Sequence, residues 1–217
     1  MEKYLGEGKN GICYLDSGKV TKIYKNTSVL YDIPSEFVGL YNSTYVFPEK
    51  MIFDSNTGKR VAALFRYINS VPLDKKDISI DDIINSIDTC YADTDKLSKQ
   101  GIRTFDVYPK NMLYDNGIKI IDIDYYYFSR DKDIYKCNID DFNTAIMLLF
   151  TNELIQVKFP KLFEKDKILF DLYKQTFLSE NDNKTLKELL LHLKKIIQEQ
   201  EQKEIKMVSE YKKILSR

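Results

Sequence analysis

Residues 105–124 read FDVYPKNMLYDNGIKIIDID, and this stretch decides the fold class. Asp106 lies in a loop before an extended segment that begins with Asn111. The Asp-Asn-Gly turn at 115–117 predicts a hairpin, because Asn and Gly readily adopt the positive φ angles of tight hairpin turns. The second strand, IKII, ends at Asp122. We therefore expect the hairpin to bring Asn111 and Asp122 together, with Asp106 beside them.

These three polar residues match the needs of phosphoryl transfer. That reaction requires oxygen ligands for a metal that grips a triphosphate, and a carboxylate that orients or deprotonates the attacking hydroxyl. Asn111 and Asp122 are the candidate ligands, and Asp106 is the candidate carboxylate. Each aspartate alone would be a turn or cap residue, but the combined spacing is more specific. The sequence thus predicts a catalytic set of Asp106, Asn111 and Asp122.

The residues before this stretch favour β-structure. TYVFPEKMIFD and KRVAALFRYI are β-rich runs joined by SNTG, which predicts a hairpin. Shorter strands are expected at GICYL and VTKIY. Residues 34–41 fit the start of a short helix, with Pro34 in its first turn and Ser35 as a possible cap.

The residues after Leu73 favour helices. Apolar residues recur at helical spacing over 79–98, and Gly101 is expected to end that helix. Helical patterns return from Asp140 onward. Residues 184–217 predict one long helix with nine basic and five acidic residues, whose first half packs on the domain. Its second half either forms a solvated face or contacts a protein partner.

The composition narrows the class of protein. The 217 residues carry 33 basic and 33 acidic side chains, so net charge gives no argument for nucleic-acid binding. Cys13, Cys90 and Cys137 fit reduced thiols, and His192, the sole histidine, argues against a histidine-based triad or metal site. No apolar run suits a signal peptide or a membrane span. We expect a cytoplasmic protein that does not bind membranes.

The segment GEGKNG fits the pattern G-x-G-x-x-G, with Gly6, Gly8 and Gly11. A dinucleotide-binding loop would need a helix after it, whereas a strand-like segment follows here. The pattern favours a glycine-rich hairpin whose backbone N–H groups lie over phosphates, with an ordinary surface hairpin as the alternative.

One lysine is placed to accompany such a hairpin. Lys22 lies in the strand VTKIY and could reach the phosphates of a nucleotide, with Glu36 as the acidic partner that fixes it. Lys25 is close enough that a shift in register would exchange the two lysines. Alternatively, Lys22 is an ordinary surface lysine.

Residues 97–124, LSKQGIRTFDVYPKNMLYDNGIKIIDID, resemble the catalytic loop and metal-binding strand of the protein-kinase-like superfamily. The resemblance is looser over residues 4–150 and is to minimal, atypical bacterial kinase-like domains. It implies a bilobal α+β fold with an antiparallel β N-lobe over 1–68, a mostly helical C-lobe over 69–183 and a long C-terminal helix over 184–217. It also implies ATP and Mg as cofactors.

The resemblance implies a role for each matching residue. Asp106 would be the catalytic carboxylate, with Asn111 and Asp122 as metal ligands. Asp124 would be a further ligand or a polar strand end. The implied nucleotide-binding residues are Gly6, Gly8, Gly11, Lys22, Glu36 and the hinge residues Arg66, Tyr67 and Ile68.

Several residues depart from the kinase pattern. Thr104 and Phe105 replace its His-Arg pair, Tyr108 replaces its catalytic-loop lysine, and Asp124 stands in place of a glycine. These departures favour an atypical kinase that phosphorylates a hydroxyl of a protein or a small molecule. Two alternatives stay open: a pseudokinase that acts through its C-terminal helix, and a small-molecule phosphotransferase of the aminoglycoside or choline type.

Overall fold

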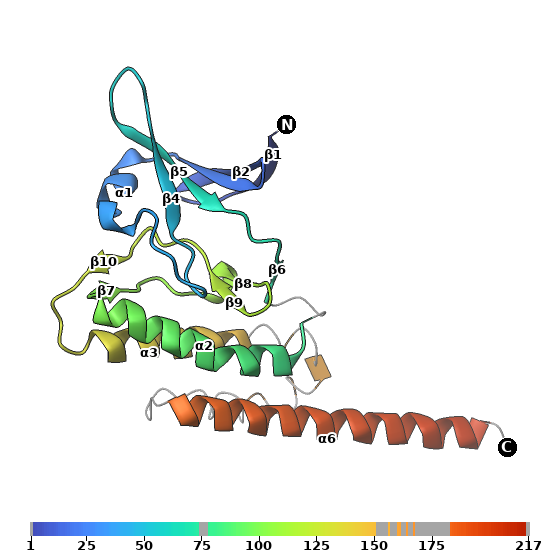
Figure 1. The fold of residues 1–217 in the computed structure, drawn as a ribbon. Coiled ribbons are helices and arrows are strands. Elements are labelled where there is room, and N and C mark those ends of the chain that lie inside the picture. Colours follow the sequence, from blue (N-terminus) through green and yellow to red (C-terminus); the bar gives the residue numbers. More distant parts are fainter. Residues whose placement is uncertain are drawn as a thin grey trace.

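The computed structural model describes residues 2–73, 78–150 and 183–215, together with the isolated positions 156, 160, 161, 164 and 167. In that part, an antiparallel sheet of five strands lies on one side and three longer helices lie on the other (Figure 1). The helices are α2 (Ile80–Lys99), α3 (Ile134–Leu148) and α6 (Asn183–Leu215). The predicted α+β class is confirmed. The helical pattern expected over 151–182 falls largely outside the described residues.

The strands of the sheet lie in the order β1-β2-β3-β5-β4, and every neighbouring pair is antiparallel. The hairpin predicted for TYVFPEKMIFD and KRVAALFRYI is confirmed by the pairing of the fourth and fifth strands. Lys22 lies on the central strand, where Cys13 and Ala63 flank it on the two neighbouring strands. The strands are β1 (Lys3–Glu7), β2 (Gly11–Asp16), β3 (Lys19–Tyr24), β4 (Pro48–Phe53) and β5 (Arg60–Arg66).

The segment between β3 and β4 differs from the prediction. It contains a short helix, α1 (Thr27–Asp32), which is capped by the side chain of Asn26. The helix expected over 34–41 is only a 3-10 turn, η1 (Ser35–Phe37). Pro34, not Ser35, is at its N-cap, and no side chain caps it. Composition identified a helical turn here but not its short extent.

Short strands connect the sheet to the helices. β8 (Met112–Tyr114) and β9 (Ile118–Ile120) form the predicted hairpin, and β6 (Val71–Pro72) pairs with β8. Asn116 and Gly117 both have positive φ, as the turn type requires. The other small elements are β7 (Ile102–Arg103), η2 (Pro109–Asn111) and β10 (Tyr127–Phe128).

The helix α2 begins and ends where its sequence signals indicate. Ser79 and Asp82 form a capping box at its start, in which each side chain bonds the backbone of the other residue. Gly101, just past its end, has φ +75°, a conformation that glycine adopts without strain. α2 packs against α3, where Tyr91 and Phe142 meet edge to face at 5.7 Å. α3 begins earlier than the Asp140 expected from the sequence.

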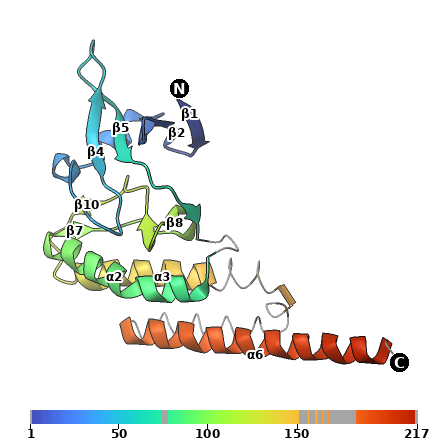
Figure 2. The same ribbon diagram turned by 45° about the vertical axis from the view of Figure 1, so that its right-hand side comes forward.

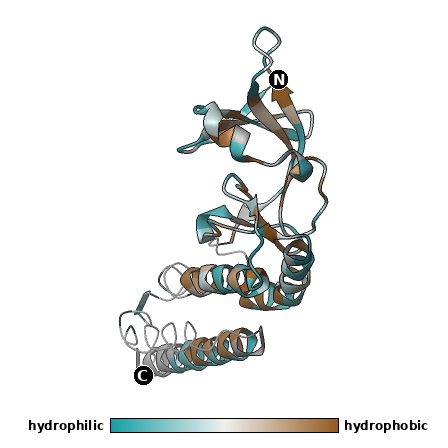
Figure 3. Ribbon diagram, turned by 90° about the vertical axis from the view of Figure 1, so that its left-hand side faces the viewer, coloured by the Kyte–Doolittle hydropathy of each residue, from teal (hydrophilic) through white to brown (hydrophobic). Residues whose placement is uncertain are grey.

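The long helix α6 runs along the other helices and extends past them at its C-terminal end (Figures 1 and 2). Around α2, α3 and α6, apolar and polar residues alternate along the ribbon (Figure 3). The buried residues of α6 recur at helical spacing: Leu186, Leu190, Leu193 and Ile197. Lys194 pairs with Asp81 on α2 at 2.5 Å. The prediction that the first half packs on the domain is confirmed.

The three cysteines, Cys13, Cys90 and Cys137, are free thiols. None of the described helices combines the length and the apolar character needed to cross a lipid bilayer.

Candidate functional site

Lys22 joins the sheet to the segment that follows β9. Its Nζ lies 2.5 Å from Asp122 Oδ1 and 2.6 Å from Asp124 Oδ2. The side chains of Lys22 and Asp124 are 12% and 1% exposed, whereas that of Asp122 keeps 34%. Because both carboxylates contact one ammonium group, they lie side by side, and one of them remains accessible to solvent.

Asp124 is held by two further donors from the sheet. The hydroxyl of Tyr24 donates to its Oδ1 at 2.8 Å, and Nδ2 of Asn10 donates to its Oδ2 at 3.0 Å. Burying a carboxylate is unfavourable unless it is paired and hydrogen-bonded, and Asp124 meets both conditions. The carboxylate therefore fixes the β1–β2 turn and β3 to the segment after β9.

The charges of this cluster do not cancel. Burial opposes ionisation of Lys22, but the two carboxylates outweigh it and raise the lysine pKa. Burial also acts against Asp124, yet Lys22 and the hydrogen bonds hold its pKa below the usual value. Burial and Asp124 raise the pKa of Asp122 despite Lys22. With both carboxylates ionised, one ammonium faces two negative charges, so the site retains a negative charge that a further cation would compensate.

Asn111 lies next to this cluster through its backbone. Its carbonyl oxygen accepts from the N–H of Ile121, the residue before Asp122, at 2.9 Å. Its own N–H donates to the carbonyl of Tyr108 at 2.9 Å. The structure thus brings Asn111 and Asp122 to adjacent positions, as the hairpin predicts.

The side chain of Asn111 is buried, and its Nδ2 has no hydrogen-bond partner among the described residues. The two ends of an amide are interchangeable in shape, so the same position could present the carbonyl oxygen. Oxygen ligands from carboxylates and amides suit Mg²⁺. In the described part of the chain no three His, Cys, Asp or Glu side chains gather as a metal site. The oxygen donors of this region are the carboxylates of Asp122 and Asp124, both bonded to Lys22, and the Asn111 amide, and donors of these types suit Mg²⁺.

Asp106 and Asp122 share an unusual backbone conformation. Their φ angles are +64° and +68°, a region that residues other than glycine seldom occupy and that is held by surrounding structure. Both carboxylates act on the same buried phenol: the pKa of Tyr126 is raised by burial first, and by Tyr45, Asp122 and Asp106 in addition. Asp106 and Asp122 thus both contribute to the electrostatic environment of Tyr126. The hydroxyl of Tyr126 has no hydrogen-bond partner among the residues that the structure describes.

One residue of α3 supports the loop that carries Asp106. Asn138 Nδ2 donates to the carbonyl of Ile102 at 2.8 Å, and its Oδ1 accepts from the N–H of Thr104 at 2.8 Å. Arg103, between them, pairs with Asp141 at 2.7 Å. These bonds fix the chain immediately before Asp106 and help it keep a strained backbone.

The three glycines of GEGKNG play different parts. A Cβ on Gly11 would lie 2.5 Å from the backbone oxygen of Ile23, so a side chain there cannot fit between β2 and β3. A Cβ on Gly6 or Gly8 would meet nothing within 4 Å. The absence of a side chain at Gly11 thus serves strand packing, while Gly6 and Gly8 leave open space above their backbone.

The two candidate lysines, Lys22 and Lys25, make different contacts. Lys22 reaches the carboxylates, whereas Lys25 pairs with Glu7 and donates to the carbonyl of Gly8 at 3.1 Å. The expected partnership of Lys22 with Glu36 is not formed. Glu36 lies exposed on η1 and accepts from the hydroxyl of Ser35 at 3.2 Å.

The predicted hinge residues lie at the end of β5 and just after it. Arg66 Nη2 donates to the carbonyl of Asn42 at 2.9 Å, and its guanidinium lies over the ring of Tyr41. Tyr67 is exposed, and Ile68 packs against the core. These residues lead from the sheet to β6, on the opposite side of the sheet from the α1 segment (Figure 1).

Two residues of the site were not predicted. Tyr24 and Asn10 both bond Asp124, and each had a signal in the sequence. Tyr24 is two residues after Lys22, and alternate strand residues share a face. Asn10 lies within the glycine-rich turn.

In comparisons with known proteins, no family model matches the chain, and no curated protein matches it.

Proposed function

We propose that this chain is an atypical phosphotransferase with a bilobal, protein-kinase-like fold, which transfers the γ-phosphoryl group of ATP to a hydroxyl. The observation that supports it best is the bridge from Lys22 to Asp122 and Asp124. It places a cationic side chain of the sheet against two carboxylates that follow the hairpin. Phosphoryl transfer requires this combination of a phosphate-binding cation and metal-binding carboxylates. We also expect the protein to be cytoplasmic.

Each residue of the chain would then have one task. Lys22 would bind phosphate oxygens, while Asp122, with Asn111 and Asp124, would hold the metal. Mg²⁺, when bound with ATP, would neutralise charge on the transferred phosphoryl group. Asp106 would orient the acceptor hydroxyl and accept its proton as the oxygen bonds to phosphorus and ADP departs.

The open backbone at Gly6 and Gly8 supports the nucleotide-binding part of the proposal. No side chain stands above either residue, so a phosphate could approach this turn closely, while the N–H of Gly8 itself already donates to the carbonyl of Gly11 at 2.9 Å. Lys25 holds this turn through Glu7 and Gly8, so the turn is tied to the residue that directly follows β3. Because this turn is already held in place, binding phosphates there would not carry the entropic cost of ordering a free loop.

The same bridge favours one alternative, a nucleotide-binding module without transfer. The ammonium of Lys22 already lies between the two carboxylates, where it competes with a metal. Such a protein would bind nucleotide through its sheet and act through a partner at the C-terminal helix.

Both functions can be tested on the full chain. The melting temperature is measured with and without millimolar Mg-ATP, and ATP turnover is measured for the wild type, Asp122→Asn and the control Asp32→Asn. The proposal expects a raised melting temperature, and turnover that Asp122→Asn abolishes and the exposed Asp32→Asn retains. A shift without turnover supports the alternative, and no shift with equal background turnover contradicts both.

A further inference from the structure

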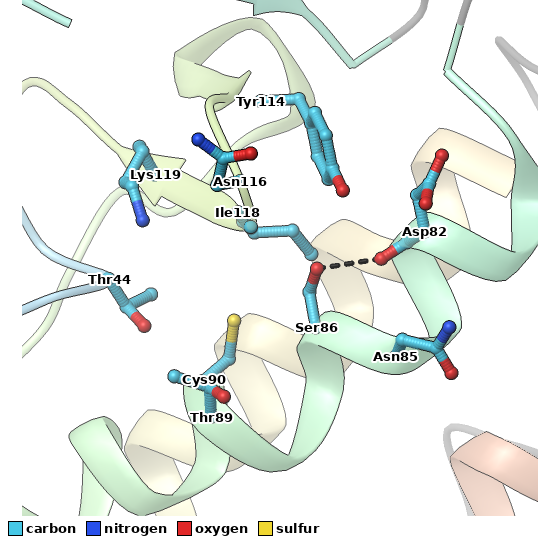
Figure 4. A pocket seen from close by; sticks show the side chains of 11 residues that line it. Thr44, Asp82, Asn85, Ser86, Thr89, Cys90, Tyr114, Asn116, Ile118 and Lys119 are labelled. Atoms are coloured by element: carbon cyan, nitrogen blue, oxygen red, sulfur yellow. Dashed lines mark hydrogen bonds between the residues drawn. The ribbon is translucent and has the colours of Figure 1, made fainter.

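A small cavity lies away from Lys22, between α2 and the β8–β9 hairpin (Figure 4). Its volume is about 200 Å³. A cavity of about 150 Å³ holds benzene, while sites for drug-sized ligands are usually about 300 Å³ or more. The cavity therefore suits a small ligand and is too small for a nucleotide.

The lining of this cavity is mostly polar. Side chains from α2 and from the hairpin surround the hollow, with amides and hydroxyls on both sides (Figure 4). The amides and hydroxyls are those of Asn85, Ser86, Thr89, Tyr114 and Asn116. The Ser86 hydroxyl already donates to the carbonyl of Asp82 at 2.7 Å, so the other amides and hydroxyls are the groups that could donate to a ligand that accepts hydrogen bonds.

The two charged side chains that line the cavity, Asp82 and Lys119, differ in whether they have a bonding partner. Asp82 accepts from the hydroxyl of Ser79 at 2.7 Å, and burial followed by this carboxylate raises the pKa of Tyr114. Lys119, by contrast, makes no ion pair among the residues described here. An ammonium has three donors and no acceptor. The cavity thus contains a half-buried ammonium that pairs with no carboxylate of the described residues, while its one carboxylate already accepts a hydrogen bond.

Lys119 is directed toward the hollow rather than away from it. A Cβ built on Gly117 would lie 3.7 Å from Lys119 Nζ and 3.9 Å from Ser86 Oγ, so both groups flank the hairpin turn. Burial raises the pKa of the Cys90 thiol, which also lines the cavity, and Lys119 is among the groups that oppose this shift. Figure 4 shows the three side chains around the same space.

We propose that this cavity is a binding site for a small oxyanion, a phosphate or a small carboxylate, held by Lys119 and the neighbouring amide and hydroxyl groups. Charge-assisted hydrogen bonds from an ammonium to such oxygens are short and strong. The site would bind its anion whether or not the chain transfers phosphoryl groups.

The test is a residue-resolved titration of the full chain by amide NMR, with inorganic phosphate, acetate and chloride at constant ionic strength. We expect saturable shifts at 116–119 with phosphate or acetate and none with chloride. Lys119→Met should weaken binding about tenfold or more, whereas Lys119→Arg, which keeps the charge, and Lys50→Met on the exposed face of β4 should retain it.

The following outcomes would contradict the proposal. If neither phosphate nor acetate gives saturable shifts at 116–119, or if Lys119→Met binds as well as the wild type, the proposal is wrong. Phosphate shifts confined to the Gly6–Gly11 turn also contradict it, and would instead support the nucleotide site. Circular dichroism confirms that each variant is folded. The wild-type titration alone is decisive if Lys119→Met does not fold.

Discussion

Lys22 of β3 and Asp124 after β9 form a buried ion pair across the chain, with Nζ 2.6 Å from Oδ2. Asp122 shares the same ammonium at 2.5 Å. The pair links the central strand of the sheet to the segment that follows the hairpin. It therefore sets both the relative position of these two parts and the electrostatics of the candidate site.

Replacing Lys22 by Met tests the structural part of this bridge. The substitution keeps the apolar stem but leaves Asp124 buried without its counterion, so we expect the free energy of unfolding to fall by about 3 kcal/mol. The matched control is Lys19→Met on the same strand. Lys19 pairs with Glu49 in solvent, and its loss should cost less than about 1 kcal/mol. Urea unfolding compares them, and equal losses would contradict a special role for the buried pair.

The two aspartates should respond to neutralisation in opposite ways. The pKa of Asp122 is raised, so its ionised form disfavours the folded state and Asp122→Asn should preserve or increase stability. The pKa of Asp124 is lowered, so its charge favours folding, and Asp124→Asn should cost about 2–3 kcal/mol. Urea unfolding near neutral pH measures both. A larger loss for Asp122→Asn than for Asp124→Asn would refute this assignment.

The same shifts predict a pH dependence. The contribution of Asp124 is complete above the usual carboxyl pKa and is lost as pH falls through its lowered folded-state pKa. The stability difference between wild type and Asp124→Asn should therefore shrink as the pH is lowered from about 7 to about 2. Denaturant unfolding at several pH values measures this difference. A difference that is constant over the range would mean that the charge of Asp124 is not what stabilises the fold.

Substitutions at the three glycines test a role in strand packing separately from a role in ligand binding. Gly11→Ala places a Cβ 2.5 Å from the Ile23 oxygen, so we expect a stability loss of about 2 kcal/mol or more. Gly6→Ala and Gly8→Ala enter open space and should change stability by less than about 1 kcal/mol. If the turn binds phosphates, these two variants should still weaken Mg-ATP binding, measured by calorimetry. Unchanged affinity in both would exclude the turn from the nucleotide site.

We expect the first half of α6 to pack and stabilise the protein without the second half. A chain ending at Ile197 keeps the buried leucines of α6, so its melting temperature should match that of the full chain. Leu190→Ala within the packed half should instead cost about 2–5 kcal/mol, because Leu190 is fully buried. Mass measurement of the shortened chain in solution then shows whether residues 198–217 mediate association. A strongly destabilised shortened chain would show that the projecting half supports the fold.

Local sequence patterns predicted the helices, strands and turns well where those patterns were strong. The Asn116-Gly117 turn and the β4–β5 hairpin follow from turn chemistry and β-rich composition, and the extent of α2 follows from the helical spacing of its apolar residues and from Gly101. The short helix α1 was missed and the one expected over 34–41 was too long, because six-residue and three-residue helical segments have little periodicity.

The site was harder to predict because its contacts are long-range. The hairpin predicted the nearness of Asn111 and Asp122, which depends on local sequence alone. The counterion of Lys22 depends on how the sheet lies against the hairpin, and this made Asp122 and Asp124 its partners in place of Glu36. Asn138 was also missed, because nothing near it in sequence indicates that it would hold Ile102 and Thr104.

The most direct test of phosphoryl transfer is a single-turnover measurement with ATP labelled at the γ-phosphate, in Mg²⁺, for the wild type and Asp106→Asn. Asp106 would act on the acceptor and not on the nucleotide, so Asp106→Asn should slow label release or transfer by about a hundredfold or more and leave Mg-ATP affinity unchanged. Equal rates in the two proteins, at the level of uncatalysed hydrolysis, would contradict the proposed function.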